Sequence, residues 1–208
     1  ENRRACSFGD ISTTSFFPAK PLVCYGDGGA IFTDDDGIAA LCRSIAVHGK
    51  NADEKYDNVR LGMNSRLDTL QAAILIPKLE AFEEYELSDV NKAAEMYTEL
   101  LSDMNGVALP AIPDSYYSSW AQYTIQLPTG TERKQVQSFM REHGIPTMIY
   151  YVKPMHRQGA FANTLSARAD CPITEELCES VLCLPIHPYL TEKEIVNVTD
   201  TLKAALKK

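Results

Sequence analysis

The feature that most constrains the fold is the alternation of strand-like and helix-like segments along almost the whole chain. Runs rich in β-branched and aromatic residues favour strands. They alternate with runs whose apolar residues recur every three or four positions, as on one face of a helix. This order is typical of α/β or α+β layer folds. We predict strands at 11–17, 30–33, 122–127, 147–151 and 181–186, and helices at 37–47, 68–103, 131–143, from 174, and at 191–206.

Several residues mark where these segments begin, bend and end. Asp34-Asp35-Asp36 offers N-cap acceptors and negative charge to the helix that follows, and Gly144 has the position expected of a helix C-terminus. Pro77 lies inside the long helical segment; it has no N–H, so we expect a kink or break near it. Residues 49–63 are polar and glycine-containing, which favours a loop, and the long connection 152–172 is of a kind that is often functional.

Charge and composition exclude several classes of protein. The 208 residues include 20 basic and 28 acidic side chains, a net charge of −8, so non-specific nucleic-acid binding is not expected. There is no apolar run long enough for a membrane span, and the start of the chain does not resemble a signal peptide. We therefore expect a cytoplasmic protein with no nucleic-acid or membrane partner. The six cysteines lack metal or redox spacing and are expected to be reduced, mostly buried thiols, with no metal site.

Lys20 is the strongest catalytic candidate. It ends the run Ser15-Phe16-Phe17-Pro18-Ala19-Lys20, directly after a predicted strand. Partial desolvation behind these apolar residues would favour the neutral amine, which can form a Schiff base with a carbonyl. The hydroxyl groups at positions 12–15 could donate hydrogen bonds to a phosphate. The alternative is an ordinary surface lysine, which composition alone favours.

The surroundings of this lysine resemble those of a known family, the DegT/DnrJ/EryC1/StrS aminotransferases. The likeness continues in order along almost the whole chain. It comprises Ser7-Phe8-Gly9-Asp10-Ile11 through Lys20, Cys24-Tyr25-Gly26-Asp27-Gly28-Gly29-Ala30, Asn64-Ser65-Arg66-Leu67-Asp68, Leu70-Gln71-Ala72-Ala73, Tyr150-Tyr151, Pro154-Met155-His156 and Leu184-Pro185-Ile186-His187-Pro188-Tyr189-Leu190.

The resemblance implies an α/β fold of the pyridoxal-phosphate-dependent transferase type, that of aspartate aminotransferase (fold type I). Residues 1–103 would then be the C-terminal part of the large cofactor-binding domain with a long connecting helix. Residues 104–208 would form the small C-terminal α/β domain, which agrees with the linker marked by Pro110, Pro113 and Asp114.

The resemblance also implies roles for single residues. Lys20 would be the Schiff-base lysine and proton shuttle, and Ser15 would bind the phosphate of pyridoxal 5'-phosphate. Asn64 would reach the cofactor phosphate of a neighbouring subunit, so that a homodimer shares its active sites. Arg66 would support that phosphate or a substrate carboxylate, or else pair with Asp68 or another nearby acid. Three residues would lie near the nucleotide-sugar, or else serve strand packing and loop capping: Tyr150, Tyr151 and His156.

The implied reaction is transfer of an amino group from glutamate to a UDP-linked keto-sugar, for cell-surface polysaccharide or antibiotic sugars. The subgroup resembles enzymes that aminate the 3-keto group of UDP-N-acetylglucosamine-derived uronic acids. The family's acidic partner of the pyridine nitrogen, its stacking aromatic residue and its phosphate turn have no match here. We expect them upstream of Glu1, and expect this chain alone to bind cofactor weakly and not to transaminate. Two alternatives are a non-catalytic or regulatory module of the same fold and another Schiff-base lysine enzyme.

Overall fold

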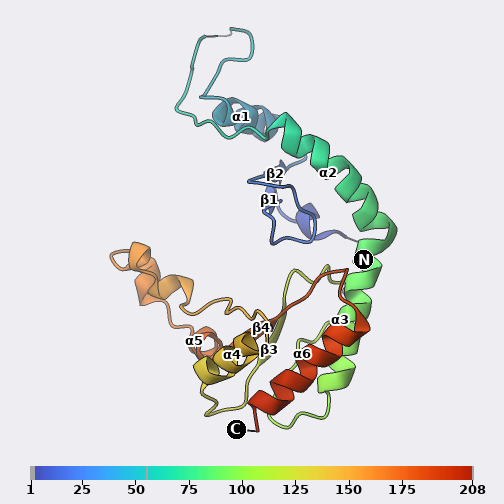
Figure 1. Cartoon of the computed structure of the whole chain (residues 1–208). Helices are drawn as coiled ribbons and strands as arrows, with labels where there is room; N and C mark the ends of the chain where they lie inside the picture. Colours follow the sequence, from blue (N-terminus) through green and yellow to red (C-terminus); the bar gives the residue numbers. More distant parts are fainter. Residues whose placement is uncertain (1–2, 55, 208) are drawn as a thin grey trace. The chain divides into compact units, whose positions relative to one another are not determined.

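The computed structural model describes residues 3–54 and 56–207. Its contacts divide the chain into two compact units, Glu1–Glu84 and Tyr85–Lys208, called unit 1 and unit 2 below. Unit 1 holds η1 (Ala5–Ser7), β1 (Ser12–Ser15), β2 (Gly29–Phe32), α1 (Asp36–Ala46) and α2 (Thr69–Ala81) (Figure 1). Unit 2 holds α3 (Leu87–Leu101), β3 (Tyr123–Gln126), α4 (Arg133–Glu142), α5 (Pro172–Ser180), β4 (Val181–Leu184) and α6 (Glu192–Ala205).

The first strands of unit 1 form an antiparallel pair in which Ser12 lies opposite Phe32 and Ser15 opposite Gly29. The helix α1 begins where the acidic run predicts, because the side chain of Asp35 accepts a hydrogen bond from the backbone N–H of Ile38 at 2.8 Å. The polar segment that follows α1 forms a loop, as predicted, with only isolated bridges in its described residues.

Of the kink or break expected near Pro77, a break at this residue is not found, because α2 runs through it to Ala81. A proline removes one backbone hydrogen bond of a helix. The helical turn after Pro77 keeps its backbone hydrogen bonds, since the N–H of Phe82 donates to the carbonyls of Lys78 and Leu79. The α-helical pattern changes instead at η2 (Phe82–Glu86), a π-helical turn that leads into α3.

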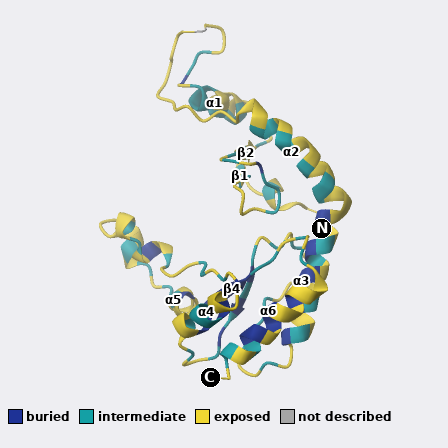
Figure 2. Ribbon diagram, in the orientation of Figure 1, coloured by how far each residue is buried: buried dark blue, intermediate teal, exposed yellow. Residues whose placement is uncertain are grey.

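The centre of unit 2 is an antiparallel pair of strands packed with helices. β3 pairs with β4, with Tyr123 opposite Leu184 and Gln126 opposite Val181. The predicted inward face of β3 is confirmed, since Tyr123, Ile125 and Leu127 are all buried. Figure 2 shows the buried residues gathered on α3, α6 and the strands, and α3, α4 and α6 supply the rest of one hydrophobic core.

The predicted strand at 147–151 is reduced to a single bridge between Met148 and Cys183. Pairing ends there because the chain turns at Tyr150 and Tyr151. The connection that follows is built from three short 3₁₀ helices, η3 (Met155–Arg157), η4 (Gly159–Phe161) and η5 (Leu165–Arg168).

Burial differs between the two units. Within the described residues of unit 1, Cys24 is the only hydrophobic side chain that is buried, and large apolar side chains such as Leu61 and Leu70 are exposed. All six cysteines are free thiols; three are buried and three partly buried. Among the described residues, no helix has the length and apolar character to span a membrane. The expected domain boundary at 103/104 remains a prediction; within this chain, α3 groups with unit 2.

Candidate active site

Lys20 lies on a closed loop between β1 and β2, residues 16–28, called the lysine loop below. The N–H of Phe16 donates to the carbonyl of Gly28 at 2.8 Å, and the N–H of Cys24 donates to the carbonyl of Phe16 at 2.9 Å. The buried thiol of Cys24 lies 3.3 Å from the Phe16 carbonyl and 3.2 Å from that of Gly26, and donates toward them. Backbone hydrogen bonds therefore close the loop at its base, and the Cys24 thiol holds its interior.

Lys20 itself occupies a turn, in which its N–H donates to the carbonyl of Phe17 at 2.8 Å. The expectation of a partly desolvated amine is wrong for this chain, because Lys20 is exposed. The physical reason is that the preceding residues are exposed as well, with Phe17 at 51%, so they cover no part of the lysine. The primary amine is open to a carbonyl compound.

Ser15 ends β1 with an exposed side chain. Its Oγ accepts a hydrogen bond from the backbone N–H of Phe17 at 3.2 Å. Since the hydroxyl serves as an acceptor there, its own proton remains available to a second partner such as a phosphate oxygen. The hydroxyl of Ser12 differs, because it donates to the carbonyl of Cys6 at 2.6 Å.

Asn64 and Arg66 lie in the exposed segment before α2. The Oδ1 of Asn64 accepts a hydrogen bond from Nε of Arg66 at 3.0 Å. This contact uses neither the Asn64 amide nitrogen nor the terminal guanidinium nitrogens of Arg66, which are groups that can donate to an anion. Within the described residues, Arg66 forms no ion pair with Asp68, the alternative considered from the sequence.

Two glycines, Gly28 at the end of the lysine loop and Gly29 at the start of β2, have no space for a side chain. A Cβ on Gly28 would lie 2.8 Å from Sγ of Cys24, and a Cβ on Gly29 would lie 2.7 Å from the carbonyl oxygen of Thr14. The Gly28-Gly29 pair is thus required by close packing against the loop interior and against β1.

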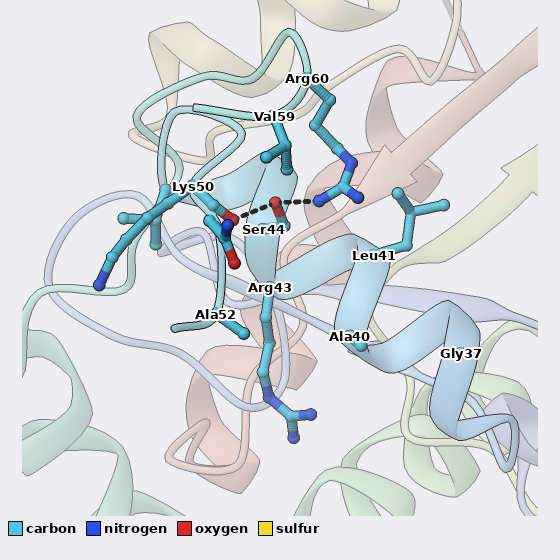
Figure 3. Close-up of a pocket in the computed structure, with 11 residues that line it drawn as sticks. Gly37, Ala40, Leu41, Arg43, Ser44, Lys50, Ala52, Val59 and Arg60 are labelled. Atoms are coloured by element: carbon cyan, nitrogen blue, oxygen red, sulfur yellow. Dashed lines mark hydrogen bonds between the residues drawn. The ribbon is translucent and has the colours of Figure 1, made fainter. Parts of the chain in front are cut away.

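Unit 1 also contains a pocket of about 630 Å³ between α1 and the loop after it. Arg60 donates to the hydroxyl of Ser44, which itself donates to the carbonyl of Lys50 at 2.6 Å. Figure 3 shows the Arg60 guanidinium directed toward Ser44, whereas Arg43 and Lys50 extend away from it. The lining includes none of the site residues predicted from the sequence, so the chemistry of Lys20, and not this hollow, defines the candidate site.

The residues predicted to lie near the sugar are in unit 2. The rings of Tyr150 and Tyr151 meet edge to face, with centroids 5.5 Å apart and planes at 70°. His156 is buried, and its Nε2 lies 2.8 Å from Oε1 of Glu175. Nε of Arg157 donates to the same oxygen at 2.9 Å. The hydrogen bond from His156, and next that from Arg157, lowers the pKa of Glu175.

Lys20, Ser15, Asn64 and Arg66 thus belong to unit 1, and Tyr150, Tyr151 and His156 to unit 2. Two further residues, which no sequence pattern linked to the site, contact the lysine loop or His156. Gln71 accepts a hydrogen bond from Tyr25 of the lysine loop, and only its place in the quoted Leu70-Gln71-Ala72-Ala73 motif could have indicated it. Glu175 accepts from His156 and lies in the helix predicted from residue 174.

A model of the DegT/DnrJ/EryC1/StrS aminotransferase family matches residues 1–203. A curated relative from Pseudomonas aeruginosa, a UDP-2-acetamido-2-deoxy-3-oxo-D-glucuronate aminotransferase, is 44% identical over 202 residues, which are 97% of this chain and 54% of that protein. The chain therefore spans about half the length of the curated relatives that it matches.

Solved structures agree with this assignment. A DegT/DnrJ/EryC1/StrS aminotransferase from Brucella abortus has a TM-score of 0.88 at 42% identity, over 98% of this chain and 52% of that one. NtdA from Bacillus subtilis, with bound cofactor PMP, has a TM-score of 0.83 at 26% identity, over 98% of this chain and 47% of that one. The predicted α/β fold of the pyridoxal-phosphate-dependent type I is confirmed, and the family depends in general on pyridoxal phosphate.

Proposed function

We propose that this chain, which belongs to the DegT/DnrJ/EryC1/StrS aminotransferase family, carries the lysine-bearing part of a sugar aminotransferase. The protein would move an amino group from glutamate to a UDP-linked keto-sugar. The observation that carries the proposal is an exposed primary amine, Lys20, held on a loop that backbone hydrogen bonds close at its base. The name of the relative from Pseudomonas aeruginosa supports a 3-oxo-glucuronate sugar. The product would serve a cell-surface polysaccharide or an antibiotic sugar.

The donor set of unit 1 fits pyridoxal 5'-phosphate. A carbonyl compound with a phosphate needs an accessible amine and several hydrogen-bond donors for the anion. Lys20 supplies the amine and Ser15 a hydroxyl proton that its contact with Phe17 leaves available. Asn64 and Arg66 supply nitrogen donors that, in the dimer proposed below, would serve the cofactor phosphate of the partner copy. When bound, the cofactor supplies an electron sink for the carbon that loses or gains a proton.

The chain's own residues would bind, orient and move protons. Nζ of Lys20 would attach to the cofactor, and as a free amine would accept and return the proton. Ser15 would orient the phosphate from the end of β1. Tyr150, Tyr151 and His156 would contact the nucleotide-sugar, with Glu175 fixing the ring of His156 through Nε2.

We also propose that the whole protein is a cytoplasmic homodimer with shared active sites. In that arrangement Asn64, which is exposed, would reach the cofactor phosphate of the partner copy. The half-length coverage of the relatives fits a chain that supplies only part of each site, with the residues that hold the pyridine ring contributed by the rest of the protein.

Reduction with borohydride after incubation with pyridoxal phosphate, followed by peptide mapping, tests the proposal. We expect the label at Lys20 and its loss in K20R. The matched control, K50R, removes another lysine of unit 1 and should keep the label. A label distributed over surface lysines with no preference for Lys20 would contradict the proposal. A full-length protein that releases no 2-oxoglutarate from glutamate would contradict the aminotransferase activity.

A further inference from the structure

Gln71 is the third residue of α2 and is half-buried. Its Oε1 accepts a hydrogen bond from the backbone N–H of Tyr25, in the lysine loop, at 2.8 Å and across 46 positions of sequence. None of the roles assigned above uses this side chain. The contact joins the start of α2 to the loop that carries Lys20.

Gly26 brings the loop backbone close to the same side chain. A Cβ at Gly26 would lie 3.1 Å from Nε2 and 3.5 Å from Cδ of Gln71. A residue without a side chain at this position therefore leaves room for the amide. The oxygen of Gln71 accepts from Tyr25, and its nitrogen occupies the space that a side chain at Gly26 would need.

Leu67, in the segment before α2, also limits the space at the loop. A Cβ added to Gly28 would lie 3.1 Å from Cδ1 of Leu67. Side chains at both Leu67 and Gln71 therefore occupy space that larger residues of the loop would need. Asn64 and Arg66 belong to the same stretch of chain, directly before Leu67.

Little else within unit 1 holds the outer part of the loop. Residues 18–27 lie outside regular secondary structure. The thiol of Cys24 fastens the interior of the loop to Phe16 and Gly26, and the backbone bonds of Phe16 fasten its base. The N–H of Tyr25 faces away from these contacts, toward α2, where Gln71 accepts it.

We propose that Gln71 is a positioning residue, which fastens the lysine loop to the segment that carries Asn64 and Arg66. Gln71 sets where the backbone of the lysine loop lies relative to the segment that presents Asn64 and Arg66, which in the proposed dimer would reach the cofactor phosphate of the partner copy. The effect of this contact on cofactor binding rests on the proposed function of Lys20. The hydrogen bond between Tyr25 and Gln71 lies within unit 1 and can be measured without the cofactor.

Three variants separate the hydrogen bond from the bulk of the side chain. Gln71→Met keeps the length and helix preference of glutamine but has no oxygen acceptor. Gln71→Glu keeps an acceptor oxygen and should restore the contact. Gln135→Met makes the same replacement at an exposed position of α4 in unit 2 and serves as the matched control.

Amide hydrogen exchange of the unloaded protein is the first measurement. Loss of one net hydrogen bond should speed exchange at Tyr25 roughly two- to tenfold in Q71M. The rate in Q71E and Q135M should equal that of the wild type. Unchanged exchange at Tyr25 in Q71M, or an equal rise at all amides of unit 1, would overturn the fastening.

Borohydride trapping with pyridoxal phosphate is the second measurement, read as the label at Lys20 relative to Lys134 on α4. We expect Q71M to lower this ratio by roughly twofold or more, and Q71E to restore it. A ratio that is unchanged in Q71M would overturn the positioning role even if exchange at Tyr25 rises. Wild-type protein without preference for Lys20 would instead refute the proposed function, while the exchange result would still decide the fastening.

Discussion

His156 and Glu175 are joined by a contact of 2.8 Å between Nε2 and Oε1, and Nε of Arg157 reaches the same oxygen at 2.9 Å. The contact ties η3, near the start of the long connection after Tyr151, to the helix α5. It also fixes which nitrogen of His156 carries a proton, because the carboxylate accepts from Nε2. Glu175 therefore sets the orientation of a residue proposed to lie near the sugar.

Glu175→Gln is expected to lower the free energy of unfolding of unit 2 more at neutral than at acidic pH. Hydrogen bonds from His156, and then from Arg157, lower the pKa of Glu175 below its usual 4.5. A carboxyl group with a lowered folded-state pKa contributes stability that is complete above the unfolded-state pKa and is lost as pH falls through the folded-state pKa. The difference between wild type and E175Q should therefore shrink below about pH 4.5.

Urea unfolding at a series of pH values checks this expectation. The chain has one tryptophan, and its ring lies 5.5 Å from that of Tyr123 in the core of unit 2, so Trp120 fluorescence reports the unfolding of that unit. Glu176→Gln, at an exposed neighbouring position, is the control. If the difference in unfolding free energy between E175Q and wild type does not change with pH, the contacts of His156 and Arg157 with the Glu175 carboxylate do not stabilise unit 2 as proposed.

Thr98→Val should destabilise unit 2 through Tyr123. The Oγ1 of Thr98 donates to the carbonyl of Ala94 at 2.9 Å and lies 2.7 Å from the hydroxyl of Tyr123. Because the threonine proton is used by Ala94, the buried tyrosine is the donor of the second bond. Removing its acceptor leaves the hydroxyl unsatisfied and should cost about 1–3 kcal/mol.

Unfolding in urea of Thr98→Val, Thr98→Ser and the double variant T98V/Y123F measures this cost. Serine keeps the acceptor and should cost much less. The double variant removes donor and acceptor together, so the two substitutions should be clearly non-additive. If the effects of the two substitutions on the free energy of unfolding simply add, the contact between the hydroxyls of Thr98 and Tyr123 makes no specific contribution to stability.

Most helices of the chain could be predicted from the sequence, because their signals are local. The acidic run before α1 and Gly144 after α4 act within one turn of the helix ends, and the alternation along β3 directly marks its buried face. A break at Pro77 is not found, because a single missing hydrogen bond does not end a helix whose neighbouring turns remain bonded.

The arrangement of the site depends on contacts between residues distant in the sequence, which local patterns do not encode. Gln71 meets Tyr25 across 46 positions and Glu175 meets His156 across 19. The expected desolvation of Lys20 was wrong for a similar reason, because burial depends on what packs over a side chain and not on its apolar neighbours in sequence. The family resemblance predicts roles for single residues, and the structure adds contacts such as those of Gln71 and Glu175, which no local pattern predicts.

Gly29→Ala is expected to disrupt the pairing of β1 and β2. The added Cβ would lie 2.7 Å from the carbonyl oxygen of Thr14, a backbone atom that cannot move without shifting the strand. Such overpacking typically costs about 1–3 kcal/mol. Faster amide exchange along β1 and β2 and weaker trapping of Lys20 would be the signs of this loss.

Gly159→Ala is the matched control for this substitution, since a Cβ there meets nothing within 4 Å. It should leave exchange in β1 and β2 unchanged and alter stability by no more than about 0.5 kcal/mol. Equal behaviour of the two variants would show that close approach to Thr14 does not constrain the strand.

Thr191→Ala should raise the pKa of Glu194 toward its ordinary value. At the start of α6, Oγ1 of Thr191 accepts from the N–H of Glu194 at 3.3 Å, and Oε2 of Glu194 accepts from the hydroxyl and the N–H of Thr191 at 2.6 and 2.8 Å. The hydroxyl is the largest cause of the lowered pKa of Glu194, and the backbone N–H is the next. Alanine removes the first and leaves the second, so the pKa should rise but remain below that of an unpaired glutamate.

The same substitution removes the N-cap of α6 and should cost about 1 kcal/mol of stability at neutral pH. Because the pKa of Glu194 is lowered in the folded state, the carboxylate's share of this stability is lost as pH falls through that pKa. The difference between wild type and T191A should therefore narrow in acid, while the share of the N–H of Glu194, which loses its acceptor, remains. NMR titration of the Glu194 carboxyl carbon, with Trp120-monitored unfolding, measures both effects. Thr191→Ser keeps the hydroxyl and should match the wild type; a serine variant that titrates like T191A would show that the methyl group, and not the hydrogen bond, is responsible.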